Sequence, residues 1–436
     1  MNRLINNARQ LALCIVDSEW KQDSLREKLD YILDGGPPDP NQLAGHLILL
    51  DTAARSPRFK EIVQTLIDNK GFSKHFSGSR RVRIQPGETK MQALPSPLST
   101  LSIPKIPNLR HLAQWLGLSD NELEWFAGLN RRYSSTNNTK LNHYHYEWRD
   151  RRAGYPRLLE KPKLRLKSLQ KEILTHILNR IPLHESAHGF RRHRSCRTSV
   201  LPHVGSQVLL KMDLQDFFLS VSRARVEGIF RMIGYPGRVA SCLAGICTHR
   251  SARQLCGDKF SVLPVATRKR FMEWHLPQGA PTSPALANLC AWRLDNRLSG
   301  LGNHMGLAYT RYADDMAFSG NGNLYHQKRF IEPLIGAIAQ EEGFCINFRK
   351  THWMRASQRQ QVFGIVLNRH PNLNRQVYDQ LKALLHNCIR FGPASQNVNQ
   401  HPNFRQHLEG RVSHAKHLNQ HRGKKLEDML KTINWD

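Results

Sequence analysis

The chain has 436 residues, with 64 lysines and arginines against 35 aspartates and glutamates, so its formal net charge is +29. A hydrophobic fraction of 40% is enough to bury real cores, which excludes disorder throughout the chain. No apolar run approaches the ~20 residues of a membrane span, and the first residues lack the basic-then-apolar layout of a signal peptide. We therefore expect a cytoplasmic protein that binds a polyanion, nucleic acid before a membrane surface.

The first 70 residues are expected to be helical, because apolar residues recur at three- and four-residue spacing, as they do from Leu25 to Leu33. This segment carries nine basic and ten acidic side chains, so the positive excess lies beyond it. We assign residues 1–84 to a helical N-terminal extension. The near-neutral charge of residues 1–70 favours docking of a protein partner. Contact with RNA through residues 80–83, or bracing of the rest of the chain, are the alternatives.

Prolines recur through residues 85–108, which we expect to form an extended linker. Residues 109–141 would follow as a helical lead-in, with a pair of helices between Leu109 and Leu129.

Later segments mix helices with strands. A basic amphipathic helix is predicted from Leu164 to Ile181, and further helices rich in lysine, arginine and histidine from Arg375 onwards. Residues 208–213 and 307–312 alternate like buried strands. Elements mixed in this order indicate an α+β fold.

Three aspartates stand out because they adjoin these strands. Asp314 and Asp315 lie between two short apolar runs, a pattern typical of a hairpin with carboxylates at its turn. Asp213 ends the earlier strand. If the strands are neighbours, Asp213 and Asp314 would hold two hard divalent cations, because Mg²⁺ prefers carboxylate and phosphate oxygens. Two such ions activate an attacking hydroxyl and stabilise a leaving pyrophosphate.

Four segments around these acids resemble the motifs of reverse transcriptases, in the family's order. Residues 312–315 (Tyr-Ala-Asp-Asp) resemble the YxDD box, and residues 276–284 (Leu-Pro-Gln-Gly-Ala-Pro-Thr-Ser-Pro) resemble the LPQGxxxSP box. Residues 211–218 resemble the first catalytic strand, and residues 343–350 the motif after the YxDD box. The resemblance implies a right-hand polymerase with fingers and an antiparallel palm sheet over residues 142–368 and a helical thumb over 369–436.

Within this family the chain resembles bacterial retron reverse transcriptases. Residues 157–170 resemble their fingers region, and Ala-His-Gly-Phe at 187–190 follows in the expected place. His203 is the histidine retained from an Asn-Ala-x-x-His box. Residues 362–368 are similar to a VTGLVVN box, with Phe363 where threonine is usual. The alternatives are another phage-defence or group II intron-like reverse transcriptase, or a non-catalytic RNA-binding protein that kept the scaffold.

The resemblance implies roles for individual residues. Asp213, Asp314 and Asp315 would be catalytic, and with Leu214 they would form the site of two Mg²⁺ ions, or of Mn²⁺ in their place. Phe218 would be the steric gate that excludes a ribose 2′-hydroxyl. The remaining nucleotide-binding residues would be Arg149 and Arg157 on the triphosphate, Gln278 and Gly279 against the nucleotide, and Lys350 as the proton donor to pyrophosphate. The RNA-binding residues would be Arg191, His203, Arg411 and Lys416.

The implied activity is RNA-directed DNA synthesis from dNTPs. A retron enzyme copies a structured noncoding RNA into single-stranded DNA and starts from an internal 2′-hydroxyl, which gives a branched RNA–DNA molecule. The resemblance also implies a role in antiphage defence, with a separate effector protein as partner. We expect that protein to dock on the N-terminal extension.

One motif competes with this interpretation. Residues 184–188 (His-Glu-Ser-Ala-His) match the HExxH pattern of zinc proteases, which requires a regular helix so that both histidines face one metal. Pro182 and Gly189 leave barely one turn, so we do not expect zinc. The eight cysteines form no CxxC pair and are expected to be reduced thiols.

Overall fold

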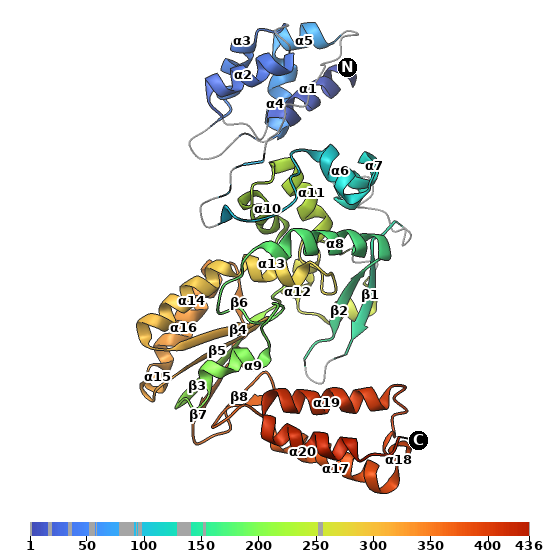
Figure 1. The fold of residues 1–436 in the computed structure, drawn as a ribbon. Helices are drawn as coiled ribbons and strands as arrows, with labels where there is room; N and C mark the ends of the chain where they lie inside the picture. The colour runs from blue at the N-terminus through green and yellow to red at the C-terminus, as the bar shows by residue number, and fades with distance from the viewer. Residues whose placement is uncertain are drawn as a thin grey trace. The chain divides into compact units, whose positions relative to one another are not determined.

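The computed structural model describes residues 2–15, 20–33, 37–51, 57, 59–77, 91–92, 94, 98–128, 141–150, 154–251 and 256–435 (Figure 1). These residues fall into two compact units. The first comprises Met1–Leu94, Lys105–Asp120 and Ile233–Ala240, and the second comprises Pro95–Pro104, Asn121–Met232 and Ser241–Asp436.

The N-terminal part of the first unit is helical, as predicted. Its helices are α1 (Asn2–Ile15), α2 (Gln22–Leu33), α3 (Pro40–Ile48), α4 (Phe59–Asp68) and α5 (Lys70–Phe76). Asp39 and Asn69 cap α3 and α5 by accepting hydrogen bonds from backbone N–H groups of the first turn. The apolar faces meet in one core that includes Leu11, Leu29 and Phe72, all fully buried. This bundle therefore has a hydrophobic core of its own.

The described part of the proline-containing segment makes specific contacts. Ile106 is buried and its N–H donates to Sδ of Met91 (3.4 Å). The N–H of Gln92 donates to the carbonyl of Gly234 (2.9 Å). The basic stretch at 80–83 lies outside the described residues. The boundaries assigned above to the extension, linker, lead-in, fingers-palm and thumb stay a prediction.

The expected helix pair of the lead-in is confirmed. Helix α6 (Leu109–Leu116) ends at Gly117, which has a φ of 62°, and α7 (Asp120–Phe126) follows. A glycine in this left-handed conformation is a common helix terminator.

An antiparallel sheet of five strands forms the centre of the second unit. Its strands are β3 (Val208–Gln215), β4 (Ala308–Tyr312), β5 (Asp315–Gly320), β6 (Cys345–Ile346) and β7 (His352–Arg355). The order is β4-β5-β3-β6, and β7 also pairs with β3. Helix α14 (Trp292–Met305) contacts β4, and α16 (Lys328–Glu341) contacts β6. Most residues of the central strand β3 are buried, which explains its nearly continuous apolar sequence.

A two-stranded ribbon and several helices precede or interrupt this sheet. The ribbon is β1 (Tyr144–Arg149) with β2 (Arg157–Pro162), and the basic helix α8 (Leu164–His176) follows it as predicted (Figure 1). The helices are α9 (Cys196–Val200), α10 (Arg223–Met232), α11 (Gly237–Cys247), α12 (Val265–Phe271), α13 (Ser283–Cys290) and α15 (Asn323–His326).

The C-terminal region is helical, also as predicted. A small sheet of β8 (Gln361–Val362), β9 (Ile365–Val366) and β10 (Asn372–Leu373) leads to α17 (Arg375–Phe391), α18 (Pro393–Gln396), α19 (Phe404–Leu418) and α20 (Gln420–Lys431). Leu385, Leu408 and Leu426 are fully buried in its core. Across the described residues, every helix is too short or too polar to cross a bilayer.

Candidate active site

The turn between β4 and β5 carries two of the predicted catalytic acids. Tyr312 pairs with Asp315, so Ala313 and Asp314 form a two-residue loop. Ala313 has a φ of 58°, a conformation that residues with a side chain rarely adopt. Strained backbone of this kind persists only where surrounding structure enforces it, which is common at functional sites. The prediction of a hairpin with carboxylates at its turn is confirmed.

Strand register brings the third acid to this turn. In the β3–β5 pair Asp213 lies directly opposite Asp315. The N–H of Leu214 donates to the carbonyl of Asp314 (2.8 Å). The side chain of Leu214 is buried, so only its backbone could contribute to a metal site. All four residues predicted for that site are therefore neighbours.

Two lysines neutralise part of this acidic cluster. Nζ of Lys350 lies 3.0 and 2.9 Å from the two carboxylate oxygens of the buried Asp213. Nζ of Lys211 lies 3.0 Å from Oδ1 of Asp315. Burial, together with the charges of Asp213 and Asp315, raises the pKa of Asp314. Burial also raises the pKa of Asp315, against the opposing effect of Lys211.

The donor set fits hard divalent cations. Among the described residues no three His, Cys, Asp or Glu side chains form a ready-made metal-binding group. However, three carboxylates are gathered where burial, followed by the charges of Asp213 and Asp315, raises the pKa of Asp314. A cation with oxygen preference would relieve the repulsion between these carboxylates, as Mg²⁺ does in carboxylate sites.

A buried polar network holds the turn in place. The guanidinium of Arg311 is fully buried and donates from Nε and Nη2 to the two oxygens of Asp295 (2.8 and 2.6 Å). Its Nη1 donates to Oδ1 of Asn288 (3.0 Å) and to the carbonyl of Ala313 (2.9 Å). Tyr309 also donates to Asp295 (2.8 Å). The backbone of the strained residue is thus tied to α13 and α14.

The loop before α9 packs directly on this turn. A Cβ added to Gly189 would lie 2.5 Å from the backbone N of Ala313, so only glycine fits. The N–H of His188 donates to the carbonyl of Arg311 (2.8 Å). Residues 184–188 form a turn and a β-bridge, and the ring of His188 contacts Thr198 (3.0 Å). The helix that an HExxH site requires is therefore not formed.

Phe218 lies beside a second aromatic ring. Its half-buried ring is 6.1 Å, centroid to centroid, from that of Phe190. Phe190 has a φ of 59° and is 50% exposed. Asp216, two residues before Phe218, accepts hydrogen bonds from Thr267 and Arg270 on α12 (2.9 and 3.3 Å). These bonds fix the segment that carries the predicted steric gate.

The segment with Gln278 and Gly279 lies against β2. The carbonyl of Gln278 accepts a hydrogen bond from the N–H of Glu160 (2.8 Å), and Gly279 is exposed with a φ of 133°. Oε1 of Gln278 is buried and accepts no hydrogen bond from the described residues. An unsatisfied buried acceptor is costly, so a donor from a ligand would stabilise it.

The two arginines predicted to bind the triphosphate lie opposite each other on neighbouring strands. Arg149 and Arg157 are a cross-strand pair at the end of the β1–β2 ribbon. Both are exposed, and Nε of Arg149 lies 2.5 Å from Glu147. Like charges directly opposite are unfavourable unless an anion joins them. Their binding of a triphosphate stays a prediction.

His203 was expected to contact RNA, and the structure corrects this. Its side chain is fully buried, with Nδ1 2.7 Å from Ser319 Oγ and Nε2 2.8 Å from Thr310 Oγ1. Burial lowers its pKa to about 4. Both ring nitrogens are used inside the protein, so His203 joins β4 and β5 to the short helical turn after α9 and has no atom left for RNA.

The other predicted RNA-binding residues are at least partly accessible. Arg191 contacts Glu185 (3.2 Å) and the carbonyl of His184. Arg411 lines a pocket of about 420 Å³ between α17 and α19. Lys416 on α19 forms an ion pair with Glu427 on α20 (2.9 Å). Their binding of RNA stays a prediction.

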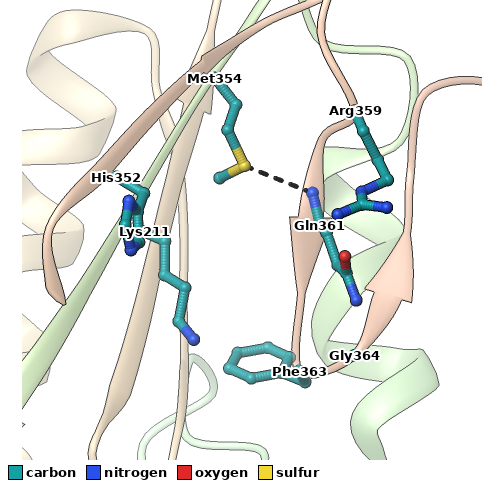
Figure 2. Close-up of a pocket in the computed structure, with 7 residues that line it drawn as sticks. All are labelled: Lys211, His352, Met354, Arg359, Gln361, Phe363 and Gly364. Carbon is teal, nitrogen blue, oxygen red and sulfur yellow. Dashed lines mark hydrogen bonds between the residues drawn. The ribbon is translucent and has the colours of Figure 1, made fainter. Parts of the chain in front are cut away.

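A second pocket, of about 340 Å³, is shown in Figure 2, and one of its lining residues is Lys211, the partner of Asp315. Lys211 and Phe363 both point into it, and the N–H of Gln361 donates to Sδ of Met354 (3.4 Å). Phe363 has a φ of 54°, and its ring lies 5.3 Å from that of Tyr312. The remaining lining residues are His352, Arg359 and Gly364. The β8–β9 turn thus contacts the catalytic hairpin.

Sequence reasoning missed the residues that support the acids. Arg311 carried a signal, since an arginine inside an otherwise apolar strand requires a buried partner. Its partners Asp295 and Asn288 come from two other elements, and no spacing in the sequence identifies them. Lys211 likewise alternates with apolar residues in β3.

Comparisons with known proteins show the family of this chain. A family model described as "Reverse transcriptase (RNA-dependent DNA polymerase)" matches residues 149–367. The Retron Mx65 reverse transcriptase of Myxococcus xanthus is 40% identical over 66% of this chain and 64% of its own length. The Retron Mx162 enzyme of the same organism is 35% identical, over 65% and 59%. The Retron Ec86 enzyme of Escherichia coli is 31% identical, over 53% and 65%.

This chain therefore spans less than two thirds of the length of each of these curated relatives. Among solved structures, a foamy viral protease–reverse transcriptase in complex with an RNA/DNA hybrid matches at 12% identity with a TM-score of 0.34. That match covers 67% of this chain and 31% of the viral one.

Proposed function

Because this chain belongs to the reverse transcriptase family, in its retron type, we propose that it is an RNA-directed DNA polymerase that copies a structured noncoding RNA into single-stranded DNA. The observation that carries this proposal is the convergence of Asp213, Asp314 and Asp315 at the ends of β3 and of the β4–β5 hairpin. Reverse transcriptases depend on divalent metal ions, and we assign these three acids as the groups that would hold two Mg²⁺ or Mn²⁺ ions.

When bound, the metal ions would activate the attacking hydroxyl of the primer and stabilise the negative charge that develops at the phosphate. The chain's own part is to position the substrates. Arg149 and Arg157 bind the triphosphate as a cross-strand pair. Gln278 accepts a hydrogen bond from a hydroxyl of the nucleotide through its unsatisfied Oε1. The ring of Phe218 restricts the space beside the sugar, with Phe190 next to it.

Lys350 was expected to protonate pyrophosphate, and in the structure it binds Asp213. Its side chain is half exposed, so it can leave this carboxylate when substrate arrives. We assign Lys350 two successive partners: Asp213 in the free protein and a phosphate oxygen during synthesis.

The basic helices of the C-terminal region would bind the RNA–DNA duplex as a thumb, through phosphate contacts that carry no sequence information. Recognition of one noncoding RNA, initiation at an internal 2′-hydroxyl, and a role in antiphage defence are proposed from the retron relatives. An effector protein would bind the helical extension, which has its own core and whose first 70 residues are nearly neutral.

The test is incorporation of labelled dNTPs on an RNA template with Mg²⁺ or Mn²⁺, with Asp213→Asn as the inactive comparison. We expect synthesis by the natural chain only. Sequencing of co-purified nucleic acid should recover a short single-stranded DNA branched from one RNA. Tight RNA binding without any extension would favour the non-catalytic alternative. Extension without branched DNA would favour a different reverse transcriptase class.

A further inference from the structure

A buried pair of ionisable side chains lies behind the nucleotide-binding segment. Glu160 on β2 and His275 are both fully buried. Nε2 of His275 lies 2.9 and 3.2 Å from the two carboxylate oxygens of Glu160. Isolated charges are strongly disfavoured in such a place, so the pair is stable only as a unit.

The surroundings satisfy the remaining polar atoms. Ser251 Oγ donates to Oε1 of Glu160 (2.5 Å), and Nδ1 of His275 contacts the carbonyl of Glu273 (2.8 Å). His249, 3.9 Å from Glu160, contacts the hydroxyl of Tyr146 (2.8 Å). Burial alone disfavours both charges, yet the mutual attraction is stronger: it lowers the pKa of Glu160 and raises that of His275. Both directions favour the ionic form of the pair.

Glu160 holds the nucleotide-binding segment at two points. Its side chain binds His275, and its backbone N–H binds the carbonyl of Gln278. A Cβ added to Gly279 would lie 2.9 Å from the carbonyl of Glu160, which shows how closely the two backbones approach. The residues between these points, Leu276 and Pro277, are consequently fixed against β2. Arg157 lies on the same strand, three residues before Glu160.

We propose that Glu160 and His275 are positioning residues for nucleotide binding: their buried ion pair sets the distance between the strand that carries Arg157 and the segment that carries Gln278 and Gly279. This inference rests on the proposed function of those residues as the nucleotide site. A buried ion pair suits this task because separating its members would leave uncompensated charges in the protein interior.

Three variants test the pair. Glu160→Gln leaves His275 without a charged partner, and His275→Gln leaves a buried carboxylate unpaired. The double variant Glu160→Gln/His275→Gln replaces the ion pair with a neutral hydrogen-bonded pair of similar shape. It provides the test if a single variant does not fold. The matched control is Arg297→Gln, which removes an ion pair to Glu341 and Glu342 between α14 and α16 (2.5 and 3.1 Å).

Two measurements are needed. In the polymerase assay we expect each single variant to raise KM for dNTP by about tenfold, with kcat and affinity for primer–template within about threefold. The double variant should recover most of that loss, and Arg297→Gln should leave KM within about twofold. Amide hydrogen exchange of residues 276–283 in the free protein should accelerate about fivefold or more in the single variants and not in the control.

The two measurements separate the inference from the proposed function. Unchanged exchange and unchanged KM in the single variants would overturn the inference even if the enzyme is active. A KM rise of equal size in Arg297→Gln would also overturn it, because the effect would then be general destabilisation. An inactive natural chain whose 276–283 segment still loosens in the variants would refute the proposed function and leave the positioning contact established.

Discussion

Arg311 donates a hydrogen bond to the carbonyl of Ala313, two residues further along the same hairpin. The same guanidinium is bound to Asp295, so a buried ion pair stabilises the strained turn that contains Asp314. This relationship makes the site geometry sensitive to residues that touch no substrate.

Replacing Arg311 with methionine should therefore cost both stability and activity. The change leaves Asp295 buried without its partner, and we expect a loss of about 3–5 kcal/mol in the free energy of unfolding, measured by denaturant titration. The double variant Arg311→Met/Asp295→Leu should regain most of that stability but not DNA synthesis, because the carbonyl of Ala313 loses its donor. Full recovery of synthesis in the double variant would contradict the proposed support of the turn.

Asp314→Asn should stabilise the metal-free protein while abolishing synthesis. Because the pKa of Asp314 is raised, its contribution to stability is complete below the ordinary aspartate pKa and is lost as pH rises through the folded value. Ionisation of Asp314 in the folded protein thus lowers stability, and asparagine removes this cost. We expect the melting temperature in EDTA at pH 7 to rise by about 1–4 °C. Asp150→Asn, at an exposed carboxylate, should leave the melting temperature unchanged. A lower melting temperature in Asp314→Asn would contradict the claim that ionised Asp314 destabilises the metal-free protein.

Phe218→Ala should admit ribonucleotides. The ring lies beside Phe190 at the end of the fixed segment after Asp213, where it would restrict the space at the sugar 2′ position. We expect the ratio of kcat/KM for dNTP over rNTP to fall about 10–100-fold. Phe330→Ala, at an exposed ring on α16, is the control and should leave the ratio unchanged. If Phe218→Ala still discriminates between the two sugars, Phe218 is not the steric gate.

Gly423→Ala should destabilise the helical C-terminal region. A Cβ there would lie 2.0 Å from Cα of Lys416, so α19 and α20 would have to separate. Overpacking of this kind costs about 1–3 kcal/mol. Gly410→Ala on α19 meets no atom within 4 Å and should stabilise its helix by about 0.5–1 kcal/mol. Thermal unfolding of both variants gives the comparison, and equal effects would show that the close approach is unimportant.

The sequence allowed the local elements around the acids to be predicted. The apolar runs before Asp213 and on both sides of Asp314 and Asp315 became β3, β4 and β5, because a strand buried on both faces needs a continuous apolar sequence. The register that places Asp213 opposite Asp315 was not accessible, since no spacing between distant strands specifies which residues pair.

His203 shows where pattern reasoning fails. Its RNA-binding role was implied by the resemblance to the Asn-Ala-x-x-His box, and only the packed structure shows that Ser319 and Thr310 bind its two ring nitrogens. The ion pair of Glu160 and His275 was missed for the same reason: 115 residues separate its members. Long-range polar pairs are decided by tertiary packing, which a single sequence does not display.

The lysines beside the acids have a consequence for the order in which the site is assembled. At rest, Lys350 and Lys211 each neutralise one of the three carboxylates, which weakens the attraction of the site for free cations. The phosphate oxygens of an incoming nucleoside triphosphate can replace the carboxylates as partners of both ammonium groups. We therefore expect isolated metal ions to bind weakly and the nucleotide with its metal to bind as one unit. Occupancy of the metal site should then depend on the nucleotide concentration more than on the concentration of free divalent cations.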